Sequence, residues 1–112
     1  MTRVALALAL LLPTAAGADE FVAEFERIFR EQVATAPEYA TDIDREQLRA
    51  IVRRFDEGLK FARSDNPELR RTGLQWMEQA RQQLDLWFRD VWERRRQLEL
   101  LTIREMSTPP SP

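Results

Sequence analysis

The sequence predicts an all-α protein, a helical hairpin or three-helix bundle in which two shorter helices pack on one long C-terminal helix. Three observations predict this class. Apolar residues recur at three- and four-residue steps in three separate stretches of the chain. Residues typical of turns and helix starts separate these stretches. A seven-residue repeat of apolar positions continues through the last and longest stretch.

The first eighteen residues have the layout of a secretory signal peptide. Arg3 is followed by an apolar run over residues 4–12, and Pro13 and the small residues 16–18 end the segment. Nine apolar residues are too few to cross a bilayer, because a spanning helix needs about 20. We expect cleavage after Ala18, which leaves a single domain over residues 19–106 and a short tail.

Composition indicates the compartment. The chain has no cysteine, so an exported domain of this sequence must be held together by packing alone. It has sixteen arginines and one lysine, a bias typical of a high-GC bacterial genome. We therefore expect a periplasmic protein, secreted through its cleaved N-terminal signal peptide.

The charge balance excludes one class of partner and leaves a question about packing. Without Arg3 the chain has nineteen acidic and sixteen basic residues, a net charge of −3, which does not fit a nucleic-acid binder. Residues 19–46 hold nine acids and three bases, whereas residues 49–71 hold seven bases and four acids. These two stretches either lie side by side or form two ordinary solvated faces.

The first predicted helix covers residues 19–34. Its apolar residues span an arc of about 140° at about 100° per residue, which is wide enough to contact two neighbouring helices. These residues are Phe21, Val22, Phe25, Ile28, Phe29 and Val33.

The second predicted helix begins at Asp44 and ends near Arg63. Asp44 and Gln47 have the spacing of a capping box, and Ile43 and Leu48 have the spacing of a hydrophobic staple around that cap. Its apolar stripe, weakened slightly by a glycine at position 58, is Leu48, Ile51, Val52, Phe55, Leu59 and Ala62.

The third predicted helix begins at Pro67, with Asn66 as its cap, and continues for about forty residues, or about 60 Å. The proline- and serine-rich residues 107–112 are expected to be disordered. The heptad positions of this helix are Met77, Leu84, Val91 and Leu98, with Ala80, Trp87, Arg94 and Leu101 between them.

The residue types available argue against enzymatic chemistry. The chain has no histidine and no cysteine, which removes the commonest general base, metal ligand and strong nucleophile. The neighbouring carboxylates Asp42 with Asp44 and Asp56 with Glu57 point in different directions on a helix, so a structural role is favoured over acid–base catalysis. We expect no catalytic residue, no cofactor and no metal site.

The long helix has more apolar surface than its neighbours can cover. A helix of about twenty residues reaches only to about residue 86 of its partner, and beyond it Leu98 and Leu101 lie nearly opposite Leu100 and Ile103. We expect an interaction surface that meets a protein partner or a second copy. It is formed by Trp92, Leu100, Ile103 and Met106, with Arg95 and Arg96 steering the approach.

Two alternatives remain. The two shorter helices together can shield this surface in a closed monomer, with Leu100 and Ile103 left as scattered exposed residues. Alternatively, the arginines at positions 94–96 beside tryptophan and leucine can settle on a membrane surface, although Glu93, Glu99 and Glu105 oppose this.

The expected function is that of a small exported non-enzymatic protein that binds other proteins, as an accessory subunit, an inhibitor or immunity-type protein, or a chaperone-like factor. Ile43 to Gln47, followed by Leu48 and Ile51, resembles the L-T-x-x-Q segment that recurs in the Spy family of periplasmic chaperones. The match has isoleucine and aspartate where the pattern has leucine and threonine, so we assign no family from it. The resemblance implies an all-helical protein that holds unfolded clients on an apolar, cationic surface.

Overall fold

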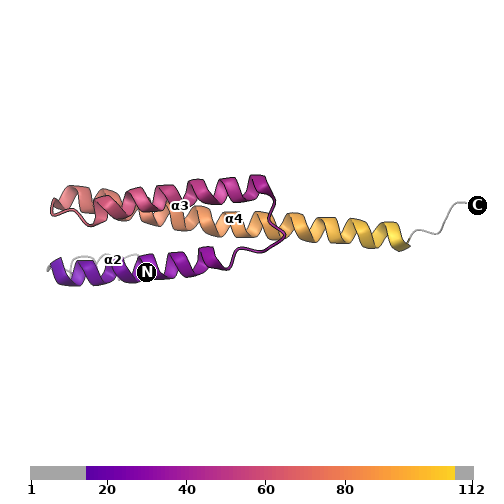
Figure 1. The fold of residues 1–112 in the computed structure, drawn as a ribbon, viewed down its shortest axis with the longest axis horizontal. Coiled ribbons are helices and arrows are strands. Elements are labelled where there is room, and N and C mark those ends of the chain that lie inside the picture. The colour runs from indigo at the N-terminus through magenta and orange to yellow at the C-terminus, as the bar shows by residue number, and fades with distance from the viewer. Residues whose placement is uncertain (1–14, 108–112) are drawn as a thin grey trace, which may run out of the picture.

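A computed structural model describes residues 15–107, and these residues form three helices. They are α2 (Ala15–Ala34), α3 (Asp42–Ala62) and α4 (Pro67–Ser107), and the described residues contain no strand (Figure 1). The prediction of an all-α fold with a long C-terminal helix is confirmed. The molecule measures 75 × 30 × 18 Å, because α4 is much longer than the helices beside it.

The helices run alternately along one axis. In Figure 1, α3 runs back along the first half of α4, and α2 lies on the same half with its direction reversed relative to α3. The second half of α4 extends alone beyond both. Helix α2 begins at Ala15, four residues before the predicted start. Most of the predicted signal peptide and residues 108–112 of the predicted tail lie outside the described residues, so these two predictions stay predictions there. Ser107, which the sequence predicts to belong to the tail, is the last residue of α4.

The start of α3 differs from the prediction. Thr41, not Asp44, is the N-cap: its hydroxyl accepts a hydrogen bond from the Asp44 backbone N–H at 3.1 Å, and its own N–H donates to Asp44 Oδ2 at 2.9 Å. Asp44 is therefore the last residue of this capping box, at the N3 position, rather than its N-cap. The predicted staple is wrong as well, because Ile43 is 73% exposed.

The end of α3 and the start of α4 are those that the sequence predicts. Helix α3 ends at Ala62, and the N–H of Arg63 bonds to the carbonyl of Leu59. Asn66 caps α4 by accepting a hydrogen bond from the N–H of Glu68 at 2.9 Å, and Pro67 is the first helical residue.

The core lies between α3 and the first half of α4, with α2 on its side. Helix α4 contributes the heptad residues from Met77 to Val91, all of them buried. Helix α2 docks through aromatic rings: Phe29 is fully buried and stacks on Phe55 of α3 with 3.8 Å between ring centroids. Phe25 packs on the same ring at 5.8 Å. As predicted, α2 contacts both other helices.

Two glycines allow α3 and α4 to approach closely. A Cβ atom at Gly58 would lie 2.9 Å from the carbonyl oxygen of Gly73. A Cβ atom at Gly73 would overlap the backbone of Ala62 and Gly58 and lie 2.8 Å from the carbonyl carbon of Phe61. The backbones themselves are therefore in contact here, and neither position has room for a side chain.

Ion pairs join α2 to α3. Glu26 accepts a hydrogen bond from Arg63 at 2.8 Å, and Arg30 donates to Asp56 at 2.7 Å. The first of these pairs joins the acid-rich stretch to the base-rich stretch, so the two stretches lie side by side. In the second pair the base, Arg30, comes from the acid-rich stretch, and the acid, Asp56, comes from the base-rich stretch.

Candidate functional site

The second half of α4 is a free arm. Val91 is the last buried residue of the helix, and every side chain from Trp92 to Ser107 is exposed. We call these sixteen residues the arm. At 1.5 Å per residue the arm is about 24 Å long, and Figure 1 shows most of it extending beyond the bundle. The alternative in which the shorter helices shield this half does not hold, because α2 lies along the first half of α4 and the side chains of the arm are exposed.

Five of the six predicted interaction residues share one face of the arm. Trp92, Arg96, Leu100 and Ile103 follow one another at steps of four, four and three residues, which places them on one side of an α-helix. The exposed fractions of the apolar members are 53% for Trp92, 54% for Leu100 and 59% for Ile103. Met106, three residues further, is 81% exposed. We call these five residues the outer face.

The two predicted steering arginines have different surroundings. The Arg96 guanidinium lies over the Trp92 ring, 5.4 Å from its centroid, and belongs to the outer face. The Arg95 guanidinium lies over the ring of Tyr39, at 5.2 Å, and donates a hydrogen bond to Glu99 at 3.1 Å. Arg95 therefore fixes the arm to the loop between α2 and α3 and stands beside the outer face rather than in it.

A polar cluster anchors the base of the arm. Asp44 is almost fully buried, and one of its carboxylate oxygens accepts a hydrogen bond from Arg94 at 2.8 Å. The backbone carbonyl of Asp44 accepts a second from the indole N–H of Trp87 at 2.8 Å. Helix α3 therefore reaches two turns further along α4 than the predicted limit near residue 86.

The charge of Asp44 is stabilised despite its burial. Desolvation raises the pKa of this carboxyl group, but hydrogen bonds from the backbone N–H and side chain of Thr41 and from the guanidinium of Arg94 lower it by more. The net pKa lies below the ordinary aspartate value. Asp44 is thus a buried anion whose partners come from both helices, and it fixes where the arm leaves the bundle.

An aromatic groove lies where the arm meets the loop between α2 and α3. Its volume is about 470 Å³, and Trp92 of the outer face forms one of its walls. The apolar surface of the arm therefore continues onto the bundle. The lining residues are Thr35, Pro37, Tyr39, Phe88, Arg89 and Trp92.

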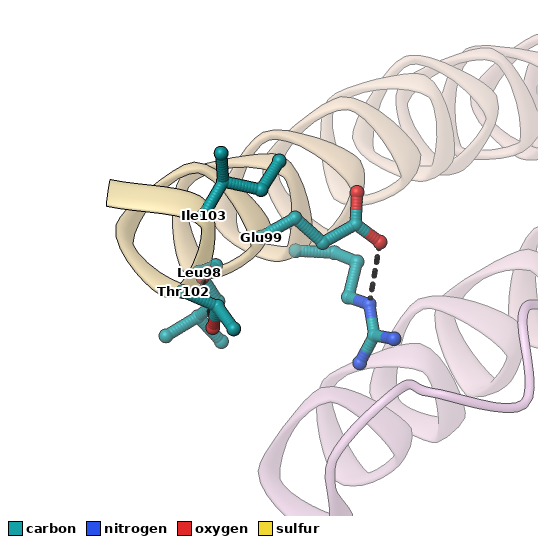
Figure 2. Close-up of a pocket in the computed structure, with 5 residues that line it drawn as sticks. Leu98, Glu99, Thr102 and Ile103 are labelled. Carbon is teal, nitrogen blue, oxygen red and sulfur yellow. Dashed lines mark hydrogen bonds and ion pairs between the residues drawn. The ribbon is translucent and has the colours of Figure 1, made fainter. Parts of the chain in front are cut away.

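The arm is apolar on its other side too. Figure 2 shows Leu98 and Thr102 on the side of the helix away from Ile103, with the Arg95–Glu99 pair between them. The depression drawn there, about 380 Å³, is lined by side chains of α4 alone, so it is the surface of one helix and not a cleft between elements. Leu98 is 54% exposed and Leu101 52%. The sequence left open whether α2 covers these two leucines, and in the structure α2 does not cover them.

Among residues 15–107 the arm presents a continuous exposed apolar surface. In this range no three histidine, cysteine, aspartate or glutamate side chains gather in a way that could hold a metal ion. None of the described helices is long and apolar enough to cross a membrane. Comparison with known proteins finds no family model, no curated protein and no solved structure that matches the chain.

Proposed function

We propose that this chain is an exported, non-enzymatic protein that binds another protein through the outer face of its arm. The observation that carries the proposal is the exposure of Trp92, Leu100, Ile103 and Met106 together on one side of the arm, of which only Trp92 borders another described element, at the aromatic groove. Contiguous apolar surface of this kind on a small domain marks an interaction site. The expected role is that of an accessory subunit, an inhibitor or immunity-type protein, or a chaperone-like factor.

The composition of the outer face favours a protein partner. Tryptophan, methionine and arginine are enriched in protein interfaces, and all three occur among its five residues. The aromatic groove at the base extends the same surface through Phe88 and Tyr39. A partner that covers the outer face and this groove removes a tryptophan ring from water on both sides, which is the typical environment of an interface hot spot.

The arm is presented in a defined direction. Asp44 and Trp87 join α3 to α4 directly below it, and Arg95 joins it to Tyr39 of the loop. A helix fixed at its base loses less conformational freedom on binding than a flexible segment of the same composition. These contacts therefore support a role for the arm in recognition.

Export is part of the proposal. Val22 is the first buried residue of α2 among those whose burial is described, and it lies four residues after the predicted cleavage site. Cleavage after Ala18 would leave Asp19 and Glu20 at the start of α2, where acidic residues are favourable to the helix dipole. The mass of the protein recovered from the periplasm tests this: the expected N-terminal residue is Asp19, and recovery of the uncleaved chain contradicts export by this route.

Site-specific crosslinking in the source cells tests the binding proposal. A photoreactive residue is placed at position 100 or 103 of the outer face, and a matched one at Glu57, an exposed position of α3 outside the arm. We expect the same discrete adducts with another protein from both arm positions and none from position 57. Adducts of equal yield at all three positions, or none at any, would contradict the proposal. Flotation with vesicles that grows with their anionic lipid content would favour a membrane surface instead.

A further inference from the structure

The side of the arm opposite the outer face continues the core seam of α4. The buried residues of this seam end with Trp87 and Val91, and the next residues at the same heptad positions are Arg94, Leu98, Leu101 and Glu105. We call these four residues the free seam. Helix α3 covers the seam only as far as Arg94, and the two leucines beyond it are about half exposed.

We propose that the free seam pairs with the free seam of a second copy of this chain, in antiparallel orientation. Along the helix the free seam has a base, two leucines and an acid. In an antiparallel pair centred between the leucines, Leu98 lies opposite Leu101 of the second copy, and Arg94 lies opposite Glu105. By symmetry each contact occurs twice.

The charges select the antiparallel orientation. A parallel pair in register would place Arg94 opposite Arg94 and Glu105 opposite Glu105, and like charges across such an interface are unfavourable. Arg94 remains able to bind a second carboxylate, because a guanidinium has five N–H donors and the Arg94 side chain is 48% exposed while it binds Asp44. The ion pair to Asp44 also holds its guanidinium at the edge of the free seam.

The lengths agree with this register. The paired segment runs from Arg94 to Glu105, and the helix of the second copy then ends near Trp92, where the loop and the start of α3 begin to cover α4. The arm of each copy thus fits between the two bundles. The outer faces of both arms stay uncovered, so this pairing does not depend on the proposed function.

The contact is small, which sets the expected affinity. Two leucines and two charges per copy over about 18 Å of helix form an interface at the low end of the size range of specific complexes. We expect a dissociation constant on the order of 100 µM at low salt. Salt should weaken the dimer, because the Arg94–Glu105 pairs are screened.

Sedimentation equilibrium of the mature chain from micromolar to millimolar concentration at low salt is the first test. We expect a monomer–dimer equilibrium, and at least a tenfold increase in its dissociation constant when Leu98 and Leu101 are both replaced by serine. The matched control is Leu86→Ser, an exposed leucine of α4 outside the arm, which should leave the dimer unchanged. Circular dichroism confirms that each variant is folded.

Two results would overturn the inference. One is a monomer at every concentration. The other is a dimer that survives the Leu98 and Leu101 substitutions but is lost when Leu100 and Ile103 are replaced by serine, because the copies would then meet through the outer face. The crosslinking experiment on the outer face has its own readout, adducts with a different protein, so failure of one proposal is distinguishable from failure of the other.

Disulfide formation tests the orientation. The chain has no cysteine of its own, so single-cysteine variants report on one position each. We expect a mixture of the Leu98→Cys and Leu101→Cys proteins to form the mixed disulfide faster than either protein forms a disulfide with itself. Faster formation of the disulfides that join two Leu98→Cys chains or two Leu101→Cys chains would indicate a parallel dimer and contradict the proposed register.

Discussion

Gly73 and Gly58 determine how closely α3 and α4 approach. In the interior of an exposed helix, replacing glycine by alanine stabilises by about 1 kcal/mol. At Gly73 the added Cβ atom would overlap the backbone of Ala62, and backbone atoms cannot move aside as a flexible side chain can. The two helices must therefore move apart, and this loosens the packing of the core between them.

We predict that Gly73→Ala lowers the free energy of unfolding by about 1–3 kcal/mol, the usual cost of overpacking. Urea unfolding followed by circular dichroism measures it. Gln79→Ala, an exposed position on the same helix, serves as the control and should change stability by less than about 0.5 kcal/mol. An unchanged or higher unfolding midpoint for Gly73→Ala would mean that α3 and α4 do not meet at these glycines.

Asp44 makes stability depend on pH in a defined direction. Its pKa is lowered in the folded protein, so the unfolded chain takes up a proton first as the pH falls. The stability that Asp44 contributes is therefore fully present above its unfolded pKa, about 3.9. It is lost as the pH falls through the lower folded value.

We predict that Asp44→Asn destabilises the protein by about 1–3 kcal/mol at pH 7, because hydrogen bonds from a charged arginine are lost in a buried site. The difference from the wild type should shrink progressively below about pH 5. Unfolding curves at several pH values test this, with Asp42→Asn at an exposed position of the same turn as the control. A difference that stays constant down to pH 2 would show that the charge of Asp44 is not what stabilises the site.

The role of Asp44 also shows where local sequence patterns stop being informative. Two residue pairs near the start of α3 have the spacing of a capping box, Thr41 with Asp44 and Asp44 with Gln47. The local sequence is therefore compatible with two different N-caps. Arg94, fifty residues away, favours the first, because it places the carboxylate of Asp44 against the long helix. No window around residue 44 contains that information. The backbone contact at Gly58 is equally non-local, and the sequence alone indicates only a weak point in a helix there.

At the scale of elements, α2 is the most weakly held of the three helices. Its docking depends on the stacked rings of Phe29 and Phe55 and on the ion pairs of Glu26 and Arg30. The ion-pair side chains are partly exposed, and such pairs contribute little. The aromatic contact therefore supplies most of the attachment.

We predict that Phe29→Ala releases α2 while the α3–α4 hairpin keeps its structure. The expected loss is about 3–5 kcal/mol of the docking free energy, typical for truncation of a buried phenylalanine. Hydrogen exchange should show lost protection over residues 19–34 and retained protection over the α3 core. Ile28→Ala, at a half-exposed neighbour, is the control. Equal loss of protection in all three helices would mean that the bundle unfolds as one unit.

The three helices were predictable because their signals are local: apolar periodicity, the Asn66–Pro67 start and the absence of breakers up to Ser107. The outer face followed from the same periodicity. The side of α4 on which α2 lies was not predictable, because it depends on the path of a short loop and on packing at Phe55. The sequence therefore left open whether Leu98 and Leu101 are covered, and the structure decides that they are exposed.

At the scale of the whole molecule, the arm adds length without contributing to the core. None of its side chains is buried, whereas the first half of α4 buries six residues. The arm has sixteen residues, little more than the roughly 12–15 below which an isolated helix is marginal in water. The arm keeps its helical form because it propagates from a segment that α3 fixes at Trp87 and Arg94.

We predict that a chain ending at Glu99, which lacks the last part of the arm, has the same free energy of unfolding as the full chain to within about 0.5 kcal/mol. Leu84→Ala in the covered half of the same helix should cost about 2–5 kcal/mol, because Leu84 is fully buried. Urea unfolding of the three proteins provides the comparison. If the truncation costs more than about 1 kcal/mol, the arm packs on the bundle and its apolar residues belong to the fold. If it costs nothing, the apolar residues after position 99 do not stabilise the fold and are free to contact another molecule.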